Sequence, residues 1–250
     1  EREVPVWRVE TDIAVIGAGV AGLYQLYRLR ELGLRVRAFE TGSAVGGTWY
    51  WNRYPGARFD SESWTYGYSF SKELLEEWAW EEHFSAQPHT ERYLNYVSDK
   101  FDLRRDIQFN SRVAAAHWRE ETQSWELVLE SGARHSTRFL GTAIGVLSAA
   151  VMPNNIPGID SFAGISCHTH RWPKDGIDIA GKRVGIIGTG ATAVQTIQTI
   201  AKSVGHLTVF QRTPNWIIPK NDREYTALEK MIGNTFPPFT NVYRFWIFLR

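Results

Sequence analysis

Hydrophobic residues gather first in a short run, 13–16, that leads directly into a glycine-rich turn at residues 17–22. A short apolar run bounded by turn residues is typical of a buried parallel strand. Apolar residues then recur at helical spacing over 23–29, and a second apolar run, 35–39, is followed by the acidic residue Glu40. The pattern predicts a strand, a helix and a second strand, with the glycine-rich turn between the first two elements.

The same order of elements returns late in the chain. Residues 182–187 predict a strand, 188–193 form a Gly-x-Gly-x-x-Ala turn, 194–203 predict a helix, and 207–210 predict the next strand. This last strand runs into the triplet Gln-Arg-Thr at 211–213 and not into an acid. Two such units predict an α/β fold with two Rossmann-like dinucleotide-binding domains.

The segment between the two units has a different pattern. Residues 70–105 are expected to be helical, and short strands are expected at 113–118, 125–129 and 137–140. The run at 142–147 is interpreted as the last strand of the first domain.

Proline and glycine within residues 153–158 indicate a linker. We therefore expect a first domain over 1–150 and a second over 151–250, with a helical insertion beginning near 225–250. The chain ends in an apolar and aromatic stretch, 242–250, and a helix this apolar is expected to be buried by further chain. We expect the sequence to be part of a longer protein.

The glycines of the first turn each have a physical role in a dinucleotide site. Gly17 permits the tight turn, Gly19 allows a pyrophosphate to approach the backbone, and Gly22 lets the helix pack closely on the strand. The N-terminus of the following helix offers N–H groups and a partial positive charge to the phosphates. Glu40, at the end of the next strand, can accept hydrogen bonds from a ribose hydroxyl.

Arg212 lies at nearly the same distance from the second turn as Glu40 does from the first. A carboxylate suits a free ribose hydroxyl, whereas an arginine suits the additional 2′-phosphate of NADP, which it can bind with two charge-assisted hydrogen bonds. The first unit is therefore expected to hold FAD and the second NADPH or NADP+.

The charge balance and the cysteine content of the chain exclude several classes of binding partner and cofactor. The 28 Lys and Arg residues nearly balance the 27 Asp and Glu residues, so a broadly basic surface for nucleic acid is not expected. A single cysteine, Cys167, excludes an internal disulfide, a cysteine-based metal site and a Cys-x-x-Cys redox pair. No apolar run is long enough to span a membrane, and residues 1–4 show no leader signal, so a cytoplasmic protein without a membrane partner is expected.

Two further motifs carry a resemblance to a known family. Residues 46–60 read GGTWYWNRYPGARFD, and residues 162–173 fit Phe-x-Gly-x-x-x-His-x-x-x-Trp-Pro at every fixed position. Together with the two turns, these motifs resemble the N-terminal part of type I Baeyer–Villiger monooxygenases, over about Asp12 to Trp216. Related flavin-containing monooxygenases have a similar fingerprint that lacks the final Trp-Pro.

The resemblance implies an enzyme that uses FAD and NADPH to insert one oxygen atom of O2 beside a ketone carbonyl, through a C4a-peroxyflavin, to give an ester or lactone. Two alternatives stay open. One is a flavin-containing monooxygenase acting on nitrogen or sulfur, and the other is a catalytically incomplete FAD- and NADP-binding fragment. The cysteine count excludes a disulfide reductase.

The resemblance also assigns site residues by position. The flavin is expected to contact Gly17, Gly19, Gly22, Glu40, Gly47, Thr48, Trp49, Asp60, Tyr66 and Val113. NADP is expected to contact Gly188, Thr189, Gly190, Ala191, Thr192, Ala193, Gln211, Arg212 and Thr213, and Trp172 is also expected to be a cofactor contact.

Three residues are assigned to catalysis through the resemblance. Asp60 and Arg58 are expected where the nicotinamide meets the flavin. His168 is expected to couple the two domains and not to act as a proton donor. The family's active-site arginine has no match within these residues, so the remaining C-terminal part of the protein is expected to be required. No metal is expected.

Overall fold

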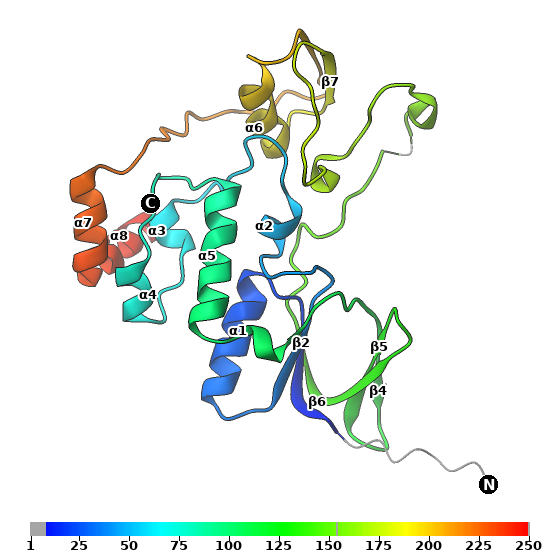
Figure 1. The fold of residues 1–250 in the computed structure, drawn as a ribbon, viewed down its shortest axis with the longest axis vertical. Helices are drawn as coiled ribbons and strands as arrows, with labels where there is room; N and C mark the ends of the chain where they lie inside the picture. The colour runs from blue at the N-terminus through cyan, green and yellow to red at the C-terminus, as the bar shows by residue number, and fades with distance from the viewer. Residues whose placement is uncertain (1–8, 154, 250) are drawn as a thin grey trace. The chain divides into compact units, whose positions relative to one another are not determined.

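The computed structural model describes residues 9–153 and 155–249, which form two compact units (Figure 1). One unit combines Glu1–Trp51 with Leu94–Pro157, and the other combines Asn52–Tyr93 with Gly158–Arg250. Residues 1–4, in which no leader signal was expected, lie outside the described residues, as do Asn154 of the expected linker and Arg250 of the terminal stretch. The domain boundary expected near residue 150 stays a prediction.

The first unit is built on a six-stranded sheet whose order is β3-β2-β1-β6-β5-β4. The strands β1, β2, β3 and β6 run parallel to one another, while β4, β5 and β6 form an antiparallel meander. The strands are β1 (Thr11–Ile16), β2 (Val36–Phe39), β3 (Ile107–Gln108), β4 (Val113–Arg119), β5 (Ser124–Leu129) and β6 (Arg134–Thr142).

Helix α1 (Val20–Glu31) connects β1 to β2 and buries Leu23 and Leu26 completely. Helix α2 (Thr48–Trp51) follows the second strand, and helix α5 (Gln87–Lys100) is followed by the short helix η1 (Arg104–Asp106). The core of the sheet contains Phe39 and Leu127, which are both buried. The strand–helix–strand unit expected from the first apolar pattern is confirmed.

The strand expected at 142–147 is wrong. Strand β6 itself pairs with β1 as far as Thr142, opposite Ile16, and the residues that follow are not in a strand. The backbone N–H of Ala143 still donates to the carbonyl of Ile16, at 2.8 Å. Because β1 turns away at Gly17, the chain beyond Ala143 has no neighbouring strand with which to pair.

Among its described residues, the second unit contains a two-stranded parallel sheet, the helix that connects its two strands, and six further helices. Strands β7 (Arg183–Ile187) and β8 (His206–Phe210) pair in register and are connected by α6 (Ala191–Ile200). The other helices are α3 (Ser63–Tyr66), α4 (Lys72–Glu77), η2 (Ile159–Ser161), η3 (Thr169–Arg171), α7 (Ala227–Thr235) and α8 (Pro237–Phe248).

Helix is interrupted between α4 and α5, so the continuous helical region expected over 70–105 is only partly correct. Residues 81–84 instead form backbone hydrogen bonds with a distant segment. The N–H of His83 donates to the carbonyl of Arg223, and the N–H of Tyr225 donates to the carbonyl of Glu81, both at 2.9 Å. The aromatic spacing of this region matched a helix, but pairing between segments decided its conformation.

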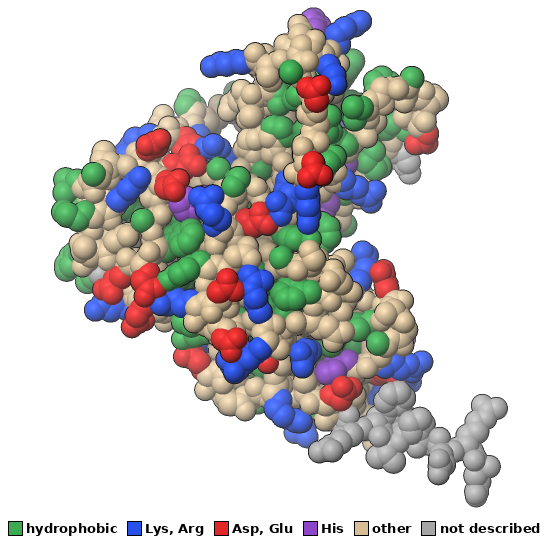
Figure 2. Space-filling view, viewed as in Figure 1, with side chains coloured by type: hydrophobic (Ala, Val, Ile, Leu, Met, Phe, Trp, Pro, Cys, Tyr) green, Lys and Arg blue, Asp and Glu red, His purple; other side chains and the backbone are tan. Residues whose placement is uncertain are grey.

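Aromatic rings form the core between α3 and the last two helices. The rings of Trp64 and Tyr225 stack with centroids 4.4 Å apart, and Phe239 and Tyr243 meet the Trp64 ring edge-on. In the described part of the chain, no helix is long and apolar enough to cross a bilayer. Figure 2 shows acidic and basic side chains interspersed on the face in view, in keeping with the balanced composition.

Candidate dinucleotide and active site

The first glycine-rich turn is closed by contacts that exclude side chains. Gly17 has a φ of +103°, and a Cβ atom there would lie 2.5 Å from the carbonyl oxygen of Ala143. A Cβ on Gly22 would lie 2.0 Å from the carbonyl oxygen of Gly17. Glycine is thus required at both positions, for backbone conformation at the first and for space at both.

Gly47 brings a second segment against this turn. A Cβ on Gly47 would lie 2.8 Å from the Cα of Gly19, and the N–H of Gly46 donates to the carbonyl of Ala18 at 3.1 Å. Helix α2, with Thr48 at its start and Trp49 buried, follows immediately. The structure therefore brings the expected flavin residues Gly17, Gly19, Gly22, Gly47, Thr48 and Trp49 into one region of the first unit.

Glu40 is buried at the edge of this region. Its Oε2 accepts from the N–H of Ala18 and its Oε1 accepts from the N–H of Gly42, each at 2.7 Å. A carboxylate offers about four lone-pair positions, so these bonds fix the group and leave further positions for hydroxyl donors. Val113, at the start of β4, also belongs to this unit, whereas Asp60 and Tyr66 belong to the other.

The second turn repeats the backbone geometry of the first. The N–H of Gly188 donates to the carbonyl of Phe210 at 2.9 Å, as that of Gly17 donates to Phe39 at 2.8 Å. Gly188 has a φ of +101°. The structure therefore supports two equivalent strand–turn–helix units, although Ala193 replaces the third glycine.

Helices α1 and α6, which follow the two turns, have open N-termini. Neither N-cap residue, Gly19 or Gly190, forms a side-chain capping bond, and neither first turn contains an acidic residue. By contrast, α4 is capped by Ser71 and α7 by Thr226, and each has a glutamate in its first turn. Since acids and side-chain caps compete with an anion for the same N–H groups, α1 and α6 are the ends suited to phosphate.

The residue that corresponds to Glu40 in the second unit is Gln211. Glu40 directly follows Phe39, and Gln211 directly follows Phe210, the equivalent residue whose carbonyl accepts from the leading glycine of its turn. Gln211 also bonds back to its turn, donating from Nε2 to Thr189 Oγ1 at 3.3 Å. Arg212 lies one residue further on, with an exposed side chain and no bonded partner among the described residues. It is available to an anionic ligand, and its role stays a prediction, as does that of Thr213.

The expected catalytic carboxylate, Asp60, lies in the same unit as the second turn. Its Oδ1 accepts from Lys220 Nζ at 2.9 Å and from Gln195 Nε2 at 3.3 Å. The side chain is 66% exposed, so its second oxygen has room for a ligand. Lys220 also donates to the carbonyl of Phe59 at 2.7 Å, which fixes the ammonium beside the carboxylate.

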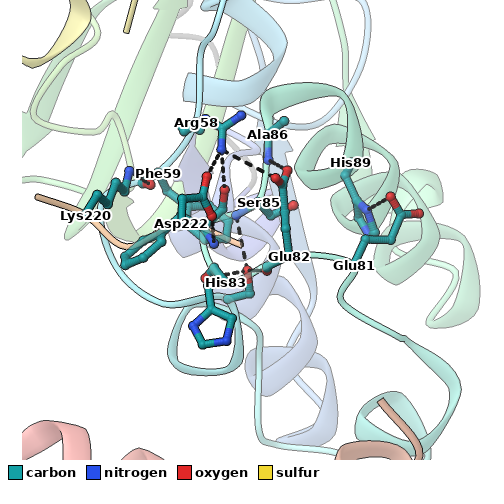
Figure 3. Close-up of polar contacts among 12 residues, drawn as sticks. Arg58, Phe59, Glu81, Glu82, His83, Ser85, Ala86, His89, Lys220 and Asp222 are labelled. Atoms are coloured by element: carbon teal, nitrogen blue, oxygen red, sulfur yellow. Dashed lines mark hydrogen bonds and ion pairs between the residues drawn. The ribbon is translucent and has the colours of Figure 1, made fainter. Parts of the chain in front are cut away.

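Arg58 is held by two carboxylates (Figure 3). Its Nη1 pairs with Asp222 and with Glu82, the latter at 3.4 Å, and also approaches the carbonyl of Phe84. Asp222 Oδ1 in turn accepts from the N–H of Phe84. These two ion pairs hold the partly buried Arg58 guanidinium in place, and its catalytic role stays a prediction.

The remaining expected residues are spread over the second unit. Tyr66 stacks on Phe59 with ring centroids 4.4 Å apart. His168 accepts at Nδ1 from the N–H of His170 at 3.1 Å, and Trp172 is half-buried at the end of the same short helix. The roles predicted for His168 and Trp172 are untested.

Sequence reasoning missed Gln195, Lys220 and His170. His170 Nδ1 lies 3.3 Å from Asn52 Oδ1, and burial lowers the pKa of its imidazole. The sequence does contain a signal for Gln195, because polar residues recur at i, i+3, i+4 and i+7 along one face of the helix, at Thr192, Gln195, Thr196 and Thr199. The sequence contains no comparable signal for Lys220, because its partner Asp60 is 160 residues away along the chain.

Comparison with curated proteins gives the following relatives. The chain is 52% identical over 214 residues to acetone monooxygenase (methyl acetate-forming) of Gordonia sp. (strain TY-5), covering 86% of this chain and 40% of that protein. It is 48% identical over 209 residues to a Baeyer–Villiger monooxygenase of Pseudooceanicola batsensis, covering 83% and 38%. It is also 48% identical over 214 residues to phenazine N-monooxygenase PhzNO1 of Lysobacter antibioticus, covering 85% and 39%.

The fold is similar to solved structures of this group. The structure titled OTEMO complex with FAD and NADP matches with a TM-score of 0.88 and 45% identity, covering 93% of this chain and 45% of that one. This match confirms the expected α/β fold with two Rossmann-like units. The chain spans about 40% of the length of the curated relatives that it matches.

The resemblance inferred from the motifs is confirmed by these relatives and by a family model. The model described as flavin-binding monooxygenase-like matches residues 10–240, which is most of the chain. The two glycine-rich turns, Glu40 and the segment that contains Asp60 all lie within that match. This chain belongs to the flavin-binding monooxygenase-like family.

Proposed function

We propose that the protein is a Baeyer–Villiger monooxygenase that uses FAD, NADPH and O2 to convert a small ketone to an ester or lactone. The observation that carries the proposal is the repeated turn, with Glu40 beside the first and Arg212 exposed after the second. The acetone monooxygenase relative, named for forming methyl acetate, favours a ketone as the substrate class. Because the chain covers only part of each relative, the activity belongs to the whole protein.

The residues of the first unit fit FAD. The close approach between Gly19 and Gly47 leaves backbone and no side chains at the open end of α1, where a pyrophosphate would be held. Glu40, fixed by two backbone N–H groups, would accept from the ribose hydroxyls. Thr48, Trp49, Asp60, Tyr66 and Val113 are proposed to line the flavin.

The residues of the second unit fit NADPH. The turn at 188–193 would hold the pyrophosphate at the open end of α6, and Arg212 would bind the 2′-phosphate. Gln211 and Thr213, on either side of that arginine, are proposed to complete this end of the site, and Trp172 is proposed as a further contact.

When bound, NADPH supplies a hydride and FAD activates oxygen. The chain's own residues therefore bind the two cofactors, orient their reacting groups and neutralise the charge of their phosphates. Asp60, with one oxygen fixed by Lys220 and Gln195, is proposed to orient the nicotinamide amide with the other. Arg58, held by Asp222 and Glu82, is proposed to lie where the nicotinamide meets the flavin, and His168 is proposed to couple the domains. We also propose that residues beyond this chain complete the active site, and that the protein works in the cytoplasm, where a lone cysteine stays reduced.

Product analysis tests this function. The complete protein is incubated with FAD, NADPH, 18O2 and a panel of ketones, sulfides and amines. One labelled oxygen in an ester or lactone supports the proposal. Consumption of NADPH that yields only hydrogen peroxide with every ketone would contradict it.

Oxygenation of nitrogen is the second candidate, and the 48% identity to a phenazine N-monooxygenase favours it. The same panel separates the two candidates, because labelled N-oxide or sulfoxide without ester would assign the protein to that reaction.

A further inference from the structure

Gln195, in the second turn of α6, meets the segment 54–60 through both ends of its side-chain amide. Its Oε1 accepts from Tyr54 Oη at 2.9 Å and from the N–H of Arg58 at 3.3 Å. Its Nε2 donates to the carbonyl of Arg58 at 3.0 Å and to Asp60 Oδ1 at 3.3 Å. One neutral side chain thus binds the backbone of Arg58 on both sides and the carboxylate of Asp60.

The backbone of the same segment lies directly on α6. Gly56 has a φ of +81°, and a Cβ there would lie 2.2 Å from Thr199 Oγ1 and 2.5 Å from the carbonyl oxygen of Gln195. This approach is closer than any other residue type would allow. The segment 54–60 is therefore in contact with α6 at two places, separated by about one helical turn.

Tyr54 strengthens this arrangement. Burial raises the pKa of its phenol above the usual value, and a hydrogen bond to Thr192 acts in the opposite direction. The hydroxyl therefore remains a proton donor to Gln195 over the whole physiological range. Thr192 and Gln195 are on the same face of α6, so Tyr54 contacts two successive turns of that helix.

These contacts have a consequence for the proposed reaction. Helix α6 begins at the turn that is proposed to hold the NADP phosphates, and Gln195 lies only two residues beyond the end of that turn. A helix of ten residues held by a sheet is a rigid element, so a group fixed to its second turn is fixed relative to its N-terminus.

We propose that Gln195 is a positioning residue that sets Asp60 and the backbone of Arg58 at a fixed place relative to the bound NADP. The inference rests on the proposed function. Gln195 itself touches no reacting atom: its amide holds the carboxylate, and the carboxylate meets the nicotinamide.

Gln195→Leu removes the amide at similar volume, and Gln198→Leu is the matched control, since Gln198 lies on the same helix with an exposed side chain. The first readout needs no cofactor. In hydrogen exchange of the whole protein, we expect the amide of Arg58 to exchange at least about tenfold faster in Gln195→Leu than in Gln198→Leu. Equal exchange in the two variants would overturn the inference.

The second readout separates positioning from folding. With NADPH at saturation, we expect the rate of flavin reduction to fall about 10- to 100-fold in Gln195→Leu, while the Kd for NADP+ changes by less than about threefold. Gln195→Asn, which keeps the amide on a shorter stem, is expected to recover part of the rate. A parallel loss of NADP+ affinity and thermal stability would show a merely structural role and overturn the inference.

The proposed function can fail separately. If the unaltered protein forms no oxygenated product but its flavin is reduced by NADPH, the function is wrong and the comparison of Gln195→Leu with Gln198→Leu still decides the inference. If the unaltered protein forms an ester and both variants behave alike, the function stands and the inference fails.

Discussion

Gln211 has the same place relative to the second turn that Glu40 has relative to the first. Each directly follows the phenylalanine whose carbonyl accepts from the leading glycine of its turn, and each bonds to the residue after that glycine. One is a buried carboxylate and the other is an exposed amide followed by an arginine. The two turns thus have the same backbone, but the first has a carboxylate at this position and the second has a neutral amide followed by an arginine, a difference that suits different nucleotides.

Gly17→Ala is expected to remove bound flavin. The substitution places a Cβ 2.5 Å from the carbonyl oxygen of Ala143 at a positive φ, so we expect a destabilisation of about 1–3 kcal/mol and a large loss of flavin. Denaturant unfolding and the absorbance ratio of flavin to protein measure the two effects. Gly33→Ala is the control, because Gly33 has a φ of +75° with nothing within 4 Å. Equal flavin loss in both variants would contradict this account of the turn.

Glu40→Gln is expected to weaken flavin binding and stability together. One side-chain oxygen becomes an NH2 group facing a backbone donor, so a buried N–H loses its acceptor at a cost of about 1–3 kcal/mol. Flavin titration of the apoprotein and denaturant unfolding check the result. Asp12→Asn alters the partly exposed pair that Asp12 of β1 forms with Arg35, and it is expected to change flavin affinity little.

Arg212→Ala is expected to change cofactor preference. The variant loses charge-assisted bonds to a 2′-phosphate, so KM for NADPH should rise at least about tenfold while KM for NADH changes by less than about threefold. Steady-state kinetics with both cofactors measure this ratio. Arg183→Ala, at an exposed position on β7, provides the control. An equal rise for NADPH and NADH would remove the 2′-phosphate assignment.

Glu126 makes stability depend on acid. This buried carboxylate pairs with Arg119 and Arg134 from the two neighbouring strands, and hydrogen bonds from these residues, Arg119 foremost, lower its pKa. Because the unfolded chain binds the proton more tightly, the stabilisation is fully present above the unfolded pKa and is lost as pH falls through the folded pKa.

The variant Glu126→Gln is accordingly expected to be less stable than the parent near neutral pH, by about 1–3 kcal/mol. The difference should shrink as pH falls from about 6 to about 3. Urea unfolding across that range measures it. Glu130→Gln, in an exposed pair with Arg112, should show little difference at any pH. A constant difference for Glu126→Gln would show that shape, and not charge, stabilises this site.

Local patterns predicted the two nucleotide units because their causes are local. Apolar runs specify buried strands, Gly17 has a positive φ that favours glycine, and Gly22 lies against the carbonyl of Gly17 only five residues earlier. The expected strands at 113–118, 125–129 and 137–140 are confirmed within β4, β5 and β6, since short apolar and aromatic runs separated by turn residues are a local signal. The strand expected at 142–147 failed because its partner, β1, ends at Ile16.

The sequence by itself determined the α/β class, the two turns, the family and the charge difference between Glu40 and Arg212. Only the tertiary structure decided that Asp60 belongs with α6 and Lys220, and that Arg58 is paired with Asp222, 164 residues away. Hydrogen bonds and ion pairs depend on distances of a few ångströms. The spacing of residues along the sequence does not predict them when the two partners are more than a hundred residues apart. Periodicity specifies elements, while packing specifies which of their polar side chains meet.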